Sequence, residues 1–159
     1  MTLRKSKLDG VRGRTDKLML KIGCCGDDCN ICPRFTATRN GDEKLLKEVA
    51  ALWKTVGWRE GKESPKQLTC NGCASISHCD LGIKDCVLEK HIENCGQCPQ
   101  YPCARLLDIF RNNEKEAEIC RARFSARDYQ IFNEAFFSKK ERLDKINKEK
   151  FNPKKGNKL

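Results

Sequence analysis

Twelve cysteines in a chain of 159 residues constrain this protein more than any other feature. Dense cysteines form disulfides in an oxidising compartment and bind metal in a reducing one. The first residues lead into no apolar run, and no stretch approaches the roughly 20 apolar residues of a transmembrane helix. We therefore expect a cytoplasmic protein with no membrane contact, whose cysteines bind metal rather than pair as disulfides.

The cysteines stand in three groups, each containing a CxxC turn that lets two thiols converge on one ion. The middle group holds four thiols, enough for one tetrahedral zinc, and we expect it to close independently. The outer groups hold three candidate ligands each, so we expect these two groups to come together in space. The ten candidate metal ligands are Cys25, Cys29, Cys32, Cys70, Cys73, Cys79, Cys86, Cys95, Cys98 and Cys103.

The two other cysteines and both histidines fit this pattern less well. Cys120 stands at helical spacing among apolar neighbours, which favours a buried, inert thiol. Cys24 adjoins a candidate ligand and is interpreted as a spare or substitute one. His78 and His91 are interpreted as residues that flank the cysteine sites rather than as ligands.

Zinc is the metal we expect, as two or more ions with a structural role. Hydrophobic residues make up only 38% of the chain, and this figure includes the twelve cysteines. A structural zinc site contributes on the order of 10 kcal/mol of binding free energy, which offsets such a sparse core. The alternative is a [4Fe–4S] cluster in a redox protein or electron carrier, because CxxxCxxC spacing and surplus thiols also suit iron–sulfur ligation.

The net charge of +10 is concentrated at the two ends of the chain. Residues 1–21 carry a net charge of +5 and residues 139–159 carry +6, whereas residues 22–138 carry −1. A basic groove across the middle of the chain is therefore not expected, and a protein partner is favoured over nucleic acid. A second alternative remains, in which the basic ends bind phosphates while a zinc core scaffolds them.

The periodicity of apolar residues predicts a mostly α, small single-domain protein of about five helices. Its cysteine-rich loops are irregular and organised by metal sites. The clearest helix covers residues 43–56, with Asp42 as N-cap and Gly57 just beyond its end. Further helices are predicted at 83–92, 102–112, 114–124 and 126–137, followed by a polar one after Ser138.

This pattern divides the chain into four parts. Residues 1–21 form a flexible basic segment, and residues 22–112 form the cysteine-rich metal-binding domain. A helical extension at 113–150 packs on that domain, and residues 151–159 form a disordered tail. Two isolated histidines and the absence of a phosphate-binding loop leave no catalytic constellation, so a non-enzyme is favoured.

The order of the cysteine motifs resembles a known family. The chain carries CGxxCxxCPxF at 25–35, CxGC at 70–73 and ENCxxCxxYPC at 94–103. This succession, over about residues 22–112, resembles the cysteine-rich domain of unknown function 3795. The resemblance implies metal binding by the ten cysteines named above and no particular activity. The expectation is a zinc-binding protein that serves as an interaction module.

Overall fold

The computed structural model describes residues 3, 22–73, 76 and 79–153 of the chain. The described residues form helices and loops with no strand, apart from an isolated antiparallel bridge between Ile22 and Asp28. The predicted mostly α, small single-domain fold is therefore confirmed. The helical elements are α1 (Pro33–Asn40), α2 (Glu43–Thr55), α3 (Pro65–Leu68), α4 (Ile83–Glu89), η3 (Cys95–Gln97), α5 (Ala104–Arg123), α6 (Ala126–Phe132), η4 (Asn133–Phe137) and α7 (Lys139–Phe151).

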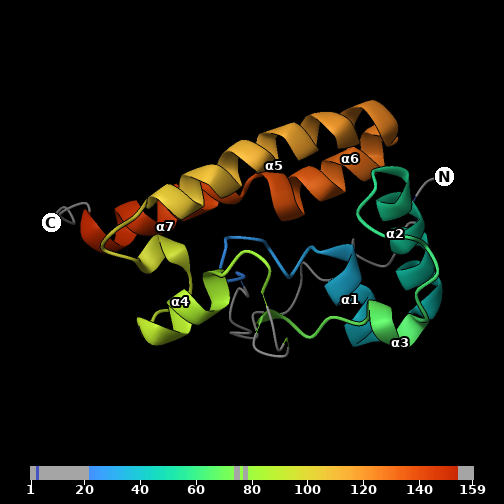
Figure 1. Cartoon of the computed structure of the whole chain (residues 1–159), viewed down its shortest axis with the longest axis horizontal. Helices are drawn as coiled ribbons and strands as arrows, with labels where there is room; N and C mark the ends of the chain where they lie inside the picture. The colour runs from blue at the N-terminus through green and yellow to red at the C-terminus, as the bar shows by residue number, and fades with distance from the viewer. Residues whose placement is uncertain (1–2, 4–21, 74–75, 77–78, 154–159) are drawn as a thin grey trace, which may run out of the picture.

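The helices lie in two tiers. Figure 1 shows α5 along the upper edge with α6 and α7 beneath it, while α1 to α4 and the cysteine-rich loops form the lower part. None of the described helices has the length and apolar character needed to cross a bilayer. The cysteine-rich loops therefore lie in the same part of the molecule as the short helices, below the long helical layer.

Helix α2 shows why the sequence pattern predicted it well. The side chain of Asp42 accepts a hydrogen bond from the backbone N–H of Leu45 at 2.9 Å, as an N-cap does. Gly57 follows the helix with φ at +81°, the left-handed conformation that glycine adopts at low cost. Its apolar stripe is buried, with Val49 and Leu52 almost fully covered.

The long helix α5 differs from the prediction. The sequence predicted two helices separated near Asn112 and Asn113, but α5 runs without a break from Ala104 to Arg123. The side-chain amide of Asn113 donates to the backbone carbonyl of Phe137 at 3.2 Å. A tertiary contact thus gives this residue a partner in mid-helix, where its weak intrinsic propensity alone suggested an end.

The segment after α5 contains a helix with a capped start, α6, followed by a wide helical turn, η4. Ser125 caps α6, because its side chain accepts a hydrogen bond from the backbone N–H of Asp128 at 3.1 Å. The predicted helix 126–137 ends as a π-helical turn, η4, over its last five residues. Ser138 does not cap α7, because its hydroxyl donates to the carbonyl of Asn133 at 3.0 Å instead.

The core is divided into an aromatic cluster and a cluster beside the cysteines. Phe132, at the centre of the aromatic cluster, makes edge-to-face contacts with Phe124 and Phe136 at centroid distances of 5.0 and 5.4 Å. Cys120 is fully buried in this cluster. Leu3 is buried there too, and its backbone N–H donates to Asp128 Oδ1 at 2.9 Å. Leu3 lies in the segment that was expected to be flexible, and the predictions for residues 1–2, 4–21 and 154–159 fall outside the described residues.

Candidate metal centres

Four cysteines from two distant parts of the chain lie together beside α1. Cys29 and Cys32 belong to the loop that precedes α1, and Cys70 and Cys73 follow α3. Cys29, Cys32 and Cys70 pack in one cluster with Phe35. Cys73 lines the same cavity as Cys29. We call Cys29, Cys32, Cys70 and Cys73 the first thiol group.

Helix α1 holds the two halves of the first thiol group together through hydrogen bonds. Arg34 donates to the backbone carbonyls of Leu68 at 2.5 Å and Thr69 at 2.8 Å. The backbone N–H of Cys70 donates to Thr38 Oγ1 at 2.9 Å. The end of α3, which leads into Cys70, is thus fixed against the helix that begins directly after Cys32.

A second set of four cysteines gathers at the junction of α4, η3 and the start of α5. Cys86 lies within α4, Cys95 is the first residue of the short turn η3, Cys98 directly follows that turn, and Cys103 is the N-cap residue of α5. The thiols of Cys103, Cys86 and Cys98 all act electrostatically on that of Cys95. We call Cys86, Cys95, Cys98 and Cys103 the second thiol group.

Two features place the second thiol group. Arg105, at the start of α5, donates to the backbone carbonyl of Gly82 at 2.9 Å and so ties α5 to the beginning of α4. The side chain of Asn94 accepts from the backbone N–H of Gly96 at 3.0 Å and shapes the turn that carries the second CxxC pair. Local turn chemistry and one tertiary contact together bring the thiols into proximity.

Burial and neighbouring thiols favour the neutral form of one cysteine in each group, Cys29 and Cys95. Burial, with a further contribution from Cys32, Cys73 and Cys70, raises the pKa of Cys29 to about 12. Burial, followed by the charges of its three neighbours in the second thiol group, raises the pKa of Cys95 to about 12 as well. Like charges disfavour one another, whereas a bound cation stabilises all the thiolates around it.

One thiol of each group stands at the N-terminus of a helix. Cys32 precedes α1 and Cys103 precedes α5. The aligned peptide dipoles of a helix favour negative charge at this end. Burial raises the pKa of Cys32 to about 11, and hydrogen bonds from the backbone amides of Phe35 and Arg34 partly oppose that rise.

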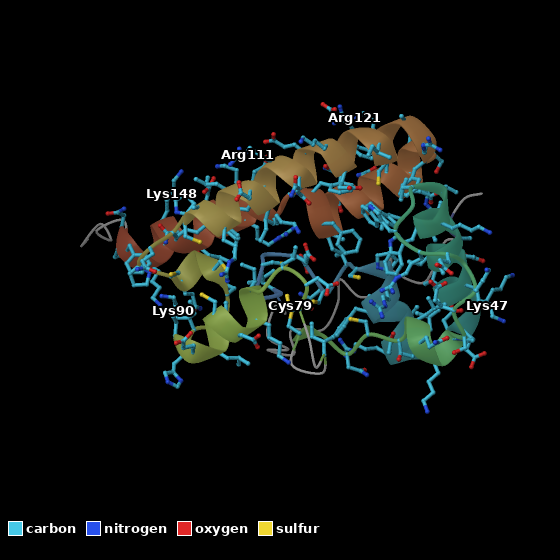
Figure 2. All side chains as sticks on the ribbon, viewed as in Figure 1. Lys47, Cys79, Lys90, Arg111, Arg121 and Lys148 are labelled. Atoms are coloured by element: carbon cyan, nitrogen blue, oxygen red, sulfur yellow. The ribbon has the colours of Figure 1, made fainter. Side chains whose placement is uncertain are left out.

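This grouping differs from the expected one, in which the first and third sequence groups met and the middle one closed independently. The structure divides the middle sequence group instead. Cys70 and Cys73 lie in the first thiol group, and Cys86 lies in the second. Cys79 belongs to neither and packs at the edge of the apolar cluster beside α4; Figure 2 shows it between α4 and α1. His78 lies outside the described residues, and His91 is exposed.

The adjacent cysteines 24 and 25 lie in contrasting environments. Cys25 is only 8% exposed and packs with Leu143 in the core. Cys24 is half-buried and lines a cavity of about 240 Å³ together with Cys29 and Cys73. The candidate ligand Cys25 is therefore buried in the apolar cluster, where its thiol still interacts with that of Cys73. Cys24, which the sequence analysis set aside, lines the cavity beside the first thiol group.

Comparison with known proteins places the chain in a family through its cysteine-rich part. The family described as a protein of unknown function, DUF3795, matches residues 21–108. The chain belongs to the DUF3795 family. Every cysteine of both thiol groups lies within the DUF3795 match, which ends inside α5. No curated protein and no solved structure shows significant similarity to the chain.

Helix α7 lies beyond the DUF3795 match and contacts the loop that precedes the first thiol group. The buried Lys139 forms an ion pair with the partly exposed Asp27, with 2.8 Å between Nζ and Oδ1. Arg142 donates to the backbone carbonyl of Gly26. Gly26 has φ at +98°, and a Cβ atom there would lie 2.7 Å from Leu143 Cγ. The N-terminal half of α7 thus packs directly onto the 25–28 loop.

The C-terminal half of α7 holds the loop of the second thiol group. Asn147 Nδ2 donates to the backbone carbonyl of Gly96 at 2.9 Å, and Lys150 Nζ donates to that of Gln97 at 3.1 Å. A Cβ atom at Gly96 would lie 2.9 Å from Ile146 Cβ, which shows how closely the helix approaches. One rigid helix therefore contacts both cysteine loops of this DUF3795 protein.

The residues fit zinc by the chemistry and number of their donors. Each thiol group supplies four sulfurs, the full donor set of a closed tetrahedral zinc site. Among the described residues, no three Cys, His, Asp or Glu side chains are already positioned to hold an ion. The thiols of each group are neighbours whose side chains would have to converge further on binding.

Sequence reasoning missed the polar residues of α7 that contact the cysteine loops. Lys139 and Asn147 lie in a polar helix whose composition is typical of a solvated surface. Nothing in the local pattern separates a buried lysine from an exposed one. The one available signal is indirect: Gly26 and Gly96, beside the cysteines, indicate places where another element approaches the backbone closely.

Proposed function

We propose that this protein binds two structural zinc ions, one in each thiol group. The observation that carries the proposal is that each group unites four cysteines from separate parts of the chain. Cys29 and Cys32 meet Cys70, which lies 38 residues beyond Cys32 in the sequence. The thin apolar core gives no other reason to gather eight thiols at two places, and only Cys32 and Cys95 among them are buried as core residues.

Zinc would add the stabilisation that these loops lack. Four thiolates around one ion satisfy its tetrahedral preference and leave no open position for a substrate. The free energy of binding then acts as folding free energy, because the unfolded chain holds no preformed site. We propose accordingly that the ions hold the fold, that the protein serves as an interaction module, and that it works in a reducing compartment such as the cytoplasm.

The proposal is tested by metal analysis of protein purified anaerobically under reducing conditions and loaded with zinc. The expected content is two ions per chain. Cys70→Ser and Cys98→Ser should each lose one ion, whereas Cys120→Ser, which alters a thiol buried in the aromatic cluster, should keep both. An anomalous-scattering map at the zinc edge should show each ion among the four sulfurs of one group.

Three outcomes would contradict the proposal. A loaded preparation without zinc would rule out metal binding by these thiols. Visible absorption together with iron and sulfide would assign the thiols to an iron–sulfur cluster. Retention of both ions by Cys70→Ser would show that Cys70 is not a ligand of the ion assigned to the first thiol group.

A further inference from the structure

The half-buried thiol of Cys24 opens onto a cavity that also borders the first thiol group. The cavity has a volume of about 240 Å³, and its lining includes Cys24, Cys29 and Cys73. A water molecule occupies about 30 Å³ of liquid volume, so solvent and a small metal-binding ligand can reach these sulfurs. Apart from these thiols, the lining is largely aliphatic, with Lys84 and Glu93 as its charged members.

Cys24 is close to both thiol groups. Its side chain hydrogen-bonds to that of Cys73, a member of the first group. Its backbone carbonyl accepts from the backbone N–H of Cys95, a member of the second group, at 2.9 Å. The backbone at Gly23 also lies against Cys73, since a Cβ atom there would be 3.5 Å from the sulfur. Cys24 is therefore an additional thiol beside the first thiol group, whose four cysteines already provide all the ligands of a tetrahedral zinc ion.

A zinc ion held by four thiolates has no vacant position, so exchange requires an incoming ligand to reach it first. A ligand that is already tethered beside the site is at high effective concentration. Cys24 has this position relative to Cys73 and Cys29, and the cavity gives it access to solvent. The buried Cys25 has no such access, although it is the adjacent residue.

We propose that this cavity is the port through which a thiophilic metal ion enters and leaves the first thiol group, with Cys24 as the exchange ligand. This inference rests on the proposed zinc function. When the Cys24 sulfur binds the ion its thiol proton passes to solvent, and the thiolate that departs takes up a proton from solvent. The metal and the sulfurs keep their oxidation states, so the step needs no oxidant or reductant.

The test measures metal exchange separately from metal content. Zinc-loaded protein is mixed with a chromophoric chelator in excess, and the release of each ion is followed by stopped-flow absorbance. Cys24→Ser should keep two ions but release one of them more slowly than the unaltered protein, because the ligand held at high effective concentration beside the site is gone. Cys120→Ser should match the unaltered protein in both measurements.

A second variant tests the port without removing a thiol. Leu88 lines the cavity and is 58% exposed, so Leu88→Trp should narrow the opening at little cost to the fold. It should slow release of the same ion that Cys24→Ser slows. Alkylation of the zinc-loaded protein, mapped by mass spectrometry, should modify Cys24 while the eight group cysteines are protected.

The outcomes separate this inference from the function on which it rests. Two bound ions with unchanged release in both variants would overturn the port and leave the zinc sites standing. Loss of an ion in Cys24→Ser would make Cys24 a permanent ligand and overturn its role in exchange. A protein that takes up no zinc would overturn both proposals.

Discussion

Gly96→Ala offers a direct test of how tightly α7 is packed against the second cysteine loop. The added Cβ atom would lie 2.9 Å from Ile146 Cβ and Cγ2 and 3.0 Å from the backbone carbonyl oxygen of Leu143. Real Cβ atoms essentially never come this close to other heavy atoms, and the opposing atoms belong to or adjoin the helix backbone. The substitution must therefore displace α7 or the loop.

The expected cost follows from two opposing effects. Overpacking of this kind costs about 1–3 kcal/mol. Replacing glycine by alanine restricts the unfolded chain, which returns about 0.4–1 kcal/mol. The net loss of unfolding free energy should therefore be about 1–2 kcal/mol, and for a chain of this length each kcal/mol lowers the melting temperature by about 2–4 °C.

The assay is guanidinium chloride unfolding followed by circular dichroism, with zinc and reductant held constant. Gly23→Ala is the matched control, because it also lies beside a cysteine loop but its Cβ atom would meet its nearest neighbours at 3.5 Å. The control should stay within about 0.5 kcal/mol of the unaltered protein. Equal stability of the two variants, with unchanged denaturant slopes, would refute the close packing of α7 on this loop.

Three further predictions follow from the contacts and charges described above. Asn147→Ala removes the amide that hydrogen-bonds to the second cysteine loop, and it should weaken one zinc site about tenfold in a chelator competition assay. Zinc loading should release protons and tighten as pH rises, because the pKa of Cys29 is raised to about 12 by burial and the thiol must deprotonate to bind. A pH indicator in weak buffer measures this release. Asp128→Ala leaves the buried N–H of Leu3 without its acceptor and should lower the unfolding free energy by about 1–3 kcal/mol in guanidinium chloride.

Each of these predictions has a control and a contradicting outcome. Lys145→Ala alters an exposed side chain of the same helix and should leave the affinity of both zinc sites unchanged. If Asn147→Ala and Lys145→Ala have the same zinc affinities, the hydrogen bond from Asn147 does not support the second site. Zinc uptake without proton release, or affinity that falls as pH rises, would contradict the raised pKa of the ligands. Asp108→Ala removes an exposed carboxylate, and a stability loss equal to that of Asp128→Ala would disprove the contribution of the Leu3 contact.

The helices that the sequence predicted correctly depend on local interactions. In α2, the cap at Asp42, the glycine after the helix and the apolar stripe all act within a few residues of one another. Helix α1 was missed because its eight residues have almost no apolar periodicity. Its signals are Pro33 in the first turn and Gly41 just after its end, which are typical of helix starts and stops.

The division of α5 was predicted wrongly for the opposite reason. Two consecutive asparagines are weak helix formers, so the local pattern favoured a break. Packing against η4 and the hydrogen bond from Asn113 to Phe137 stabilise the continuous helix. A contact between residues 24 positions apart has no signature in the local sequence.

The sequence by itself determined which residues are candidates for metal binding. CxxC spacing brings two thiols onto one turn whatever the surroundings, so the pairs at 29–32, 70–73 and 95–98 follow from the chain alone. Only the tertiary structure decided which pairs meet. That choice depends on Arg34 and Thr38 binding the segment before Cys70, and on one helix, α7, spanning both cysteine loops. These contacts join side chains to backbone carbonyls and amides, which are the same at every residue, and so no sequence pattern identifies the partner.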